Sequence, residues 1–127
     1  MTQGETSRQN GGTESQEQKM LFRWAKIYQG RYPELELLFH IPNGGYREQR
    51  EAARFKQEGV KAGVPDLFLP IPKNDYAGLF IELKRKKGGR ISEAQGWWLE
   101  QLRCWGYRAE VCCGCDEAIE TIVEYLG

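Results

Sequence analysis

Residues 63–84 of the chain read GVPDLFLPIPKNDYAGLFIELK. Two apolar runs, residues 66–69 and 77–84, flank the turn-rich segment PIPKNDY. This connection is too short for the crossover that two parallel strands need, so the pattern predicts an antiparallel hairpin. We therefore expect the two runs to be neighbouring strands of one sheet.

The segments around this hairpin predict an α/β fold, in which a mixed sheet has helices packed against it. Helical spacing and strand alternation define the other elements, with Thr13 or Ser15, Ser92 and Asp116 as candidate helix N-caps. The expected order is helix 13–30, strand 35–41, helix 46–58 closed by Gly59, strands 66–69 and 77–84, a helix between Ser92 and Gly106, strand 108–113 and a last helix from Asp116.

The composition predicts one compact domain, because the chain has 127 residues and 40% of them are hydrophobic. Residues 1–13 are polar and predict a flexible tail, which leaves residues 14–127 as the domain. No apolar run approaches the roughly 18 residues that cross a bilayer, and the N-terminus lacks the features of a signal peptide. We expect an intracellular, cytoplasmic protein that does not enter a membrane.

The charges cancel in number but not in position, since 18 basic residues balance 18 acidic ones. Residues 84–90, KRKKGGR, carry only positive charge, whereas the chain from Glu110 onward carries only negative charge. An anion is therefore expected to approach one side of the molecule. The alternative for such a basic run is an ordinary solvated loop.

Four cysteines lie in the last quarter of the chain, three of them at Cys112, Cys113 and Cys115. A disulfide framework is not expected in an intracellular protein. The spacing is not that of a zinc knuckle, and the only histidine, His40, is far away in the sequence. Buried small residues at the end of a strand are the preferred interpretation, with a metal site as the alternative.

A possible catalytic group follows from the alternation of the second hairpin strand. This alternation places Glu82 and Lys84 on one face together with Phe80, and the hairpin brings Asp66 beside Glu82. Two carboxylates and a lysine suit a Mg²⁺ or Mn²⁺ site that hydrolyses a phosphodiester. The alternative is a buried salt bridge between Glu82 and Lys84 without catalysis.

The spacing of Pro65-Asp66 and Glu82-Leu83-Lys84 resembles that of the PD-(D/E)xK nucleases, which have a restriction-endonuclease-like core. The longer motifs resemble the VRR-NUC family, the virus-type replication-repair nucleases, and the resemblance covers residues 14–126. The motifs are HIPNGGYR (40–47), EGVKAGVPDLFLP (58–70), GLFIELKRKKGGRISEAQ (78–95) and GYRAEVCCGCDEAI (106–119).

The resemblance implies roles for individual positions. Asp66 and Glu82 match the metal-binding acids, and the carbonyl of Leu83 matches a main-chain ligand. Lys84 matches the catalytic lysine, and Gln95 matches a glutamine on the helix beside the site. The superfamily often adds an acid from its first helix; Glu14 is the choice here, Glu17 is its competitor, and a solvated residue is the alternative for both.

Two loops are candidates for holding DNA. Lys86, Lys87 and Arg90 follow the catalytic strand, and the adjacent glycines let the backbone approach a phosphate. Asn43 and Arg47, with Gly44 and Gly45 between them, form a second polar loop, for which a plain turn is the alternative. His40 is a weaker candidate for a general base than for a structural group.

The resemblance also implies a partner and a substrate. Similarity to dimeric junction resolvases implies a homodimer that cuts branched DNA such as four-way (Holliday) junctions and leaves 5′-phosphate ends, in a phage or mobile-element setting. Trp97, Trp98 and Trp105 are candidates for the interface, because adjacent tryptophans on one helix cannot face the same core. The alternatives are a nuclease without a branch requirement and a DNA-binding module without catalysis.

Overall fold

The protein, for which we analysed a computed structural model, is described over residues 12–42 and 49–127. One sheet has the strand order β1-β2-β3-β4. The β1–β2 and β2–β3 pairs are antiparallel and the β3–β4 pair is parallel, so the predicted hairpin and mixed sheet are confirmed. The strands span Phe39–His40 (β1), Leu67–Leu69 (β2), Leu79–Lys84 (β3) and Arg108–Cys113 (β4).

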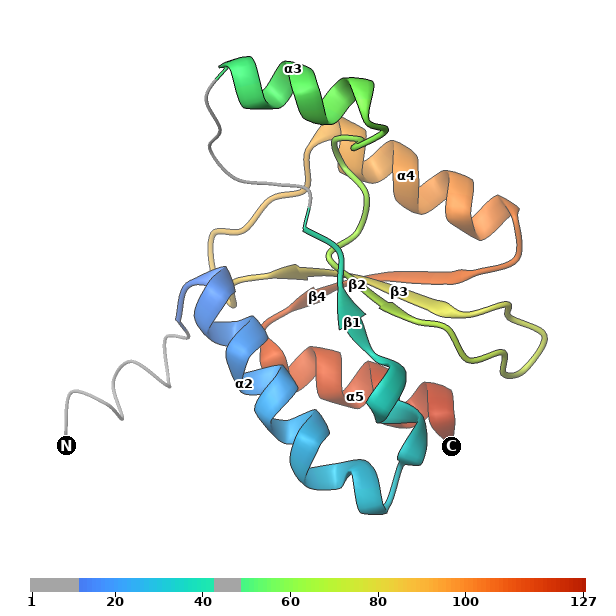
Figure 1. The fold of residues 1–127 in the computed structure, drawn as a ribbon. Coiled ribbons are helices and arrows are strands. Elements are labelled where there is room, and N and C mark those ends of the chain that lie inside the picture. The colour runs from blue at the N-terminus through green and yellow to red at the C-terminus, as the bar shows by residue number, and fades with distance from the viewer. Residues whose placement is uncertain (1–11, 43–48) are drawn as a thin grey trace, which may run out of the picture.

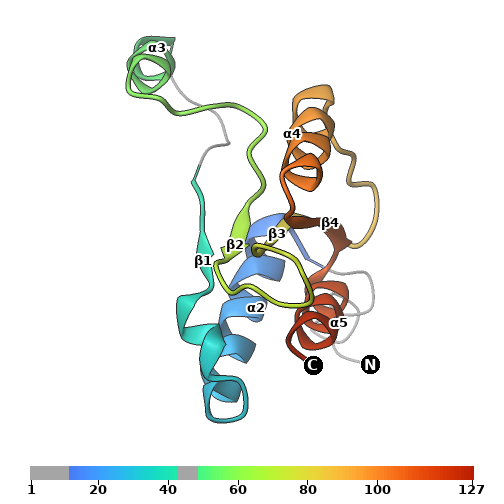
Figure 2. The ribbon, with the colours of Figure 1, turned by 90° about the vertical axis from the view of Figure 1, so that its right-hand side faces the viewer.

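Helices cover both faces of the sheet (Figure 1). Helices α2 (Glu14–Ile27) and α5 (Cys115–Leu126) lie on one face, and α4 (Glu93–Cys104) lies on the other. Helix α3 (Gln49–Gln57) stands apart from the sheet, on the same side as α4 (Figure 2). The α/β class is therefore confirmed.

The main core lies between the sheet and the pair α2 and α5. Alternate residues of β2 and β3 are buried there, since a strand turns every second side chain to the same face. The buried cluster includes Leu67, Leu69, Leu79, Ile81 and Leu83 from the strands and Leu21, Ala25, Ala118, Ile122 and Tyr125 from the helices. The opposite face of β3 is thereby left for Phe80, Glu82 and Lys84.

The first helix begins as predicted at Thr13, whose hydroxyl accepts a hydrogen bond from the N–H of Gln16 while the Gln16 side chain accepts one from the N–H of Thr13. This capping box satisfies donors that the first turn of a helix leaves unpaired. A short 3₁₀-helix, Tyr28–Gly30, completes the predicted span to residue 30.

The predicted strand over residues 35–41 is mostly wrong. Pro33–Leu37 form a 3₁₀-helix with Pro33 in the first turn, and only Phe39 and His40 form a strand. Leu35 and Leu38 are buried while Leu37 is exposed, which is a spacing of three rather than two. Proline at the start favours a helical turn, and this signal outweighs the apparent alternation.

The start of the last helix also differs from the prediction, whereas the predicted closing glycine of the second helix is confirmed. The last helix begins at Cys115 with Gly114 as its N-cap, so Asp116 lies in the first turn and does not cap it. Helix α3 ends at Gln57, and Gly59 has the positive φ of +93° expected for a glycine that closes a helix. Residues 46–48, which belonged to the predicted second helix, lie outside the described residues.

Candidate active site

Asp66, Glu82 and Lys84 lie together where β2 and β3 run side by side. Leu67 pairs with Ile81, which brings Asp66, the residue before β2, next to Glu82. The main-chain N–H of Leu83 donates a hydrogen bond to Asp66 Oδ2 at 2.9 Å. Lys84 Nζ lies 3.5 Å from Glu82 Oε2. Three groups that the sequence places at separate positions therefore form one cluster.

Burial makes this cluster energetically unusual. Glu82 is 1% exposed and Lys84 is 7% exposed. Taking a carboxylate and an ammonium out of water is costly unless each is paired. Glu82 Oε2 has Lys84 and Gln95 as partners, but Oε1 is buried and has none among the residues that the structure describes. The site thus contains a buried carboxyl oxygen that has no hydrogen-bond partner among the described residues.

The pKa of the Glu82 carboxyl reflects this burial. The pKa of the Glu82 carboxyl is raised to about 8, mainly by burial and also by the neighbouring negative charge of Asp66, while Lys84 lowers it. The folded protein therefore holds a proton on Glu82 at pH values where a free glutamate is ionised. A cation beside Asp66 and Glu82 would replace that proton and favour the charged form.

Gln95 links helix α4 to this carboxylate. Its Oε1 accepts the N–H of Ser92 at 2.8 Å in the predicted Ser92 cap, and its Nε2 donates to Glu82 Oε2 at 3.1 Å. Because the capping bond occupies the oxygen, the amide nitrogen is the atom that faces the carboxylate. The helix cap thereby orients Gln95 towards Glu82.

The donor set fits a hard divalent cation. Carboxylate and carbonyl oxygens are the ligands that Mg²⁺ and Mn²⁺ prefer, and Mg²⁺ usually keeps several waters. Within residues 12–42 and 49–127, no three His, Cys, Asp or Glu side chains gather closely enough to hold an ion. A metal here would thus rest on Asp66 and Glu82, with water and a main-chain oxygen such as that of Leu83 completing its coordination.

The two candidate acids of α2 lie in different environments. Glu14 is exposed in the first turn, whereas Glu17 is only 1% exposed. Glu17 Oε1 accepts the N–H of Cys115 at 2.8 Å, and its Oε2 accepts the N–H of Gly12 at 2.8 Å. Glu17 therefore caps the start of α5, which its own N-cap glycine cannot do. Sequence reasoning missed this role, because residues 98 positions apart share it.

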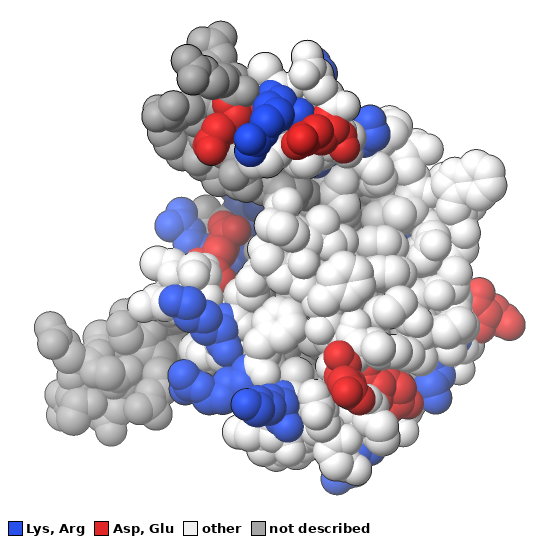
Figure 3. Space-filling view, viewed as in Figure 1, with Lys and Arg blue, Asp and Glu red and all other residues white. Residues whose placement is uncertain are grey.

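The basic loop after β3 divides into two kinds of residue. Lys86 is half-buried, its Nζ lies 3.5 Å from Asp116 Oδ2, and its stem packs so closely on Gly114 that a Cβ there would meet it at 2.6 Å. Lys87 and Arg90 are exposed. In Figure 3, Lys and Arg gather along the left side of the molecule, where β3 ends and α2 begins in Figure 1.

The other candidates lie outside this cluster or outside the described residues. Asn43 and Arg47 belong to the residues that the structure does not describe. His40 is exposed, and its Nδ1 lies 2.9 Å from the main-chain oxygen of Asp66. Cys112 and Cys115 are buried, and burial raises the pKa of each thiol to about 11, as expected for small residues packed in a core.

The three tryptophans differ from one another. Trp97 is 56% exposed and Trp105 is 80% exposed. Trp98 is half-buried, and its indole N–H donates to the carbonyl of Ala62 at 3.0 Å. Adjacent tryptophans thus face different surroundings, and the contact of Trp98 with the loop before Asp66 had no signal in the sequence.

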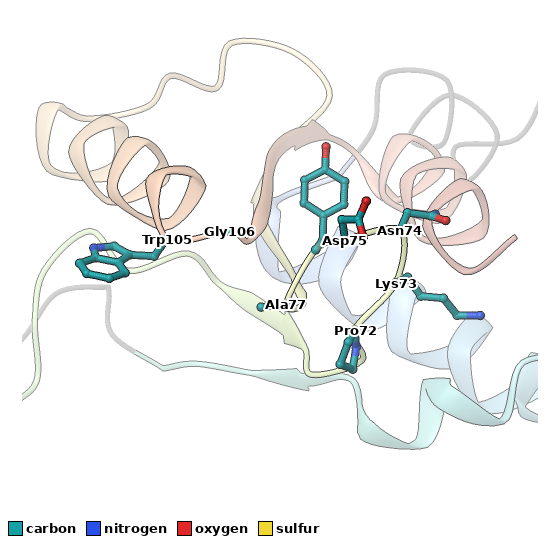
Figure 4. A pocket seen from close by; sticks show the side chains of 8 residues that line it. Pro72, Lys73, Asn74, Asp75, Ala77, Trp105 and Gly106 are labelled. Atoms are coloured by element: carbon teal, nitrogen blue, oxygen red, sulfur yellow. The ribbon is translucent and has the colours of Figure 1, made fainter.

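A separate hollow of about 500 Å³ lies at the β2–β3 turn. It is lined by Pro72, Lys73, Asn74, Asp75, Tyr76, Ala77, Trp105 and Gly106. Its side chains do not converge, since Trp105 lies at one side and Lys73 extends away from it (Figure 4). None of the predicted site residues lines this hollow, so the acidic cluster remains the candidate active site.

Comparison with known proteins agrees with the motifs and the fold. The chain matches the VRR-NUC domain family over residues 12–116. A solved structure described as "VRR_NUC domain protein" has a TM-score of 0.79 and 38% sequence identity, and the match covers 92% of this chain and 92% of that chain. No curated relative matches. The chain belongs to the VRR-NUC family, whose domain has a nuclease-type fold.

Proposed function

We propose that the protein is a Mg²⁺- or Mn²⁺-dependent endodeoxyribonuclease that hydrolyses phosphodiester bonds in branched DNA such as four-way junctions. The observation that carries the proposal is the buried Glu82 Oε1, which has no hydrogen-bond partner in the described part of the chain and lies beside Asp66 and Lys84. Buried polar atoms in folded proteins are almost always satisfied, so such an atom in a cluster of charges indicates a ligand.

In this proposal the chain's residues prepare hydrolysis by a water molecule. A bound divalent ion would neutralise the phosphate and lower the pKa of a bound water. Asp66 and Glu82, with the Leu83 carbonyl, hold the ion, and Gln95 holds the Glu82 carboxylate in place. The ammonium of Lys84 orients the water and offsets negative charge. The new bond joins the water oxygen to phosphorus, the P–O3′ bond breaks, and the 3′ oxygen takes a proton, leaving a 5′-phosphate.

The same proposal assigns DNA contacts. Lys87 and Arg90 are exposed beside the catalytic strand and are proposed to neutralise backbone phosphates. Lys86 is proposed to take part from its position between the loop and Asp116. Asn43 and Arg47 are proposed as contacts of the second loop, and Glu14 as a further acid that acts from the start of α2.

Branched DNA and a homodimer are the finer parts of the proposal. Two copies related by a twofold axis would present two active sites to two strands of a symmetric junction. Exposed aromatic side chains support self-association, because Phe39, Trp97 and Trp105 are each about half or more exposed. Light scattering on the purified protein tests this part, and a monomer at micromolar concentration would contradict it.

A cleavage panel tests the enzymatic proposal. Labelled four-way, flap and linear duplex DNA are incubated with the protein over a titration of Mg²⁺ or Mn²⁺, with Asp66→Ala as the control for contaminating nucleases. Cutting of branched forms alone supports the proposal, and equal cutting of linear duplex indicates a nuclease without a branch requirement. Binding without cutting in either metal would contradict the proposal and indicate a DNA-binding module.

A further inference from the structure

Helix α2 carries three cations that the catalytic cluster does not use. Lys19, Arg23 and Lys26 are all exposed, and together we call them the α2 basic stripe. Their spacing of four and three residues puts them on one face of the helix. Leu21 and Ala25 lie on the opposite face and are buried in the core. The stripe therefore points to solvent because the other face of α2 must pack against the sheet.

The α2 basic stripe is not neutralised by the residues that the structure describes. Among residues 12–42 and 49–127, none of the three cations has an ion-pair partner, although acids equal bases over the whole chain. Other cations of the chain are paired, as Lys86 is with Asp116 and Arg108 with Glu110 and Glu124. Like charges along one helix face repel one another, so an unpaired row carries a small cost that an external anion would remove.

The stripe continues the basic surface at the end of β3. Glu17, one turn before Leu21 on the buried side of α2, reaches the start of α5. There a Cβ at Gly114 would meet both Glu17 Oε1 and the Lys86 side chain. The first turns of α2 and the loop that carries Lys87 and Arg90 are therefore neighbours in the fold. Figure 3 shows basic side chains both at this loop and over α2, along the same side of the molecule.

We infer that the α2 basic stripe is a second DNA-binding surface, which holds the phosphate backbone of a duplex arm as it leaves the active site. The inference rests on the proposed function for the identity of the polyanion. The stripe spans eight residues of helix, and the seven steps of 1.5 Å between the first and the last give about 10 Å, which suits two or three successive phosphates of one strand. Such contacts position DNA without reading its sequence.

Binding measurements test the stripe. The affinity for labelled DNA is measured by fluorescence anisotropy over a range of salt concentrations. The wild type is compared with the Lys19→Gln/Arg23→Gln/Lys26→Gln variant and with the three single variants. Each phosphate contact contributes about 0.9 to the slope of log affinity against log salt, so the triple variant should lose roughly 2 to 3 from that slope and bind about tenfold or more weakly at low salt. The melting temperature should stay close to that of the wild type, because these side chains are exposed.

The matched control is Lys73→Gln, which removes one positive charge at the β2–β3 turn, outside the α2 basic stripe. It should bind as the wild type does, whereas Lys19→Gln should bind more weakly. An unchanged affinity and slope in the triple variant would overturn the inference, and so would an equal loss in Lys73→Gln. Loss of binding to anionic vesicles with DNA binding unchanged would also overturn it, in favour of a lipid surface. If the wild type binds DNA but does not cut it, the proposed nuclease activity is contradicted, whereas the inference that the α2 basic stripe binds DNA is still decided by the binding measurements.

Discussion

Asp66 Oδ2 accepts a hydrogen bond from the main-chain N–H of Leu83 at 2.9 Å, and this bond holds the carboxylate against the peptide between Glu82 and Lys84. The bond joins the residue before β2 to the end of β3. The position of Asp66 therefore depends on the register of β2 with β3, in which Leu67 pairs with Ile81. A shift of register by one residue would turn Glu82 and Lys84 to the other face.

Asp66→Asn separates charge from structure. The asparagine keeps an oxygen that accepts the Leu83 N–H, so the fold should keep its stability or gain some as a negative charge leaves the neighbourhood of Glu82. The affinity for Mn²⁺ should fall by about tenfold or more, because one of two carboxylate ligands is lost. Calorimetric titration of Mn²⁺ checks the affinity, and a wild-type value would exclude Asp66 as a ligand.

Glu82 should make the stability of the metal-free protein depend on pH. Its pKa rises from the ordinary 4.5 to about 8 on folding, so the folded state binds the proton more tightly than the unfolded state does. The free energy of unfolding should therefore fall as the pH rises from about 4.5 to about 8, by a few kcal/mol at most. Glu82→Gln should flatten this part of the profile. Urea denaturation in the presence of EDTA at several pH values measures the free energy of unfolding. If this free energy depends on pH equally in the wild type and in Glu82→Gln, Glu82 is not the titrating group.

Lys84→Met should separate cleavage from binding. Methionine fills a similar volume, but it cannot orient a water or offset charge in the transition state. Single-turnover cleavage should slow by roughly 100-fold or more, the range seen when a proton-handling group is lost. The DNA dissociation constant should change little, since Lys84 is only 7% exposed and offers little surface to a ligand. A parallel loss of binding and cleavage would assign Lys84 to DNA contact instead.

Glu17 and Glu14 should respond differently to removal. Glu17→Ala leaves the buried N–H of Cys115 without its acceptor, which should cost about 1–3 kcal/mol of unfolding free energy. Glu14→Ala should change stability by less than about 0.5 kcal/mol, because Glu14 is exposed. If Glu14 acts at the metal, its variant should instead weaken Mn²⁺ binding. The reverse pattern in urea denaturation would contradict the capping role of Glu17.

Trp98 should act as a positioning residue for Asp66. Its indole N–H donates a hydrogen bond to the carbonyl of Ala62. A Cβ at Gly63 would meet the main chain of Ala94 at 2.7 Å. The loop before Asp66 therefore packs closely against α4. Trp98→Phe removes the indole donor. Amide exchange over residues 59–66 should become faster by roughly fivefold or more, with Mn²⁺ affinity reduced. Trp97→Phe, the same change at the exposed neighbour, is the control, and equal effects of the two changes would exclude this role.

The β2–β3 hairpin is the most predictable part of the molecule, for a physical reason. A charged residue in an apolar strand is costly, so Glu82 and Lys84 stand out from the alternation around them. The short turn then determines that Asp66 lies beside them. Local chemistry also identified the caps at Thr13 and Ser92, because a capping box lies within four consecutive residues.

The features that the sequence did not predict depend on contacts between residues that are far apart in the chain. The N-cap of α5 is a glycine with φ of +96°, and its capping acceptor comes from Glu17 in the first helix. No local pattern indicates such a bond, so Asp116 was the natural but wrong prediction. The hydrogen bond of Trp98 to Ala62 spans 36 residues and was equally hidden. The 3₁₀-helix over Pro33–Leu37 did have a local signal in the proline at its start, but the apparent alternation of apolar residues led to the wrong prediction of a strand.

The central claim is that Asp66, Glu82 and Lys84 hold a divalent ion that enables hydrolysis of DNA. The most direct measurement is cleavage of a labelled four-way junction by the wild type and by Glu82→Gln, with Mg²⁺ and with EDTA. The claim predicts cutting by the wild type in Mg²⁺ alone, with products that a DNA ligase can rejoin through their 5′-phosphates. Cutting that persists in EDTA or in Glu82→Gln would contradict it.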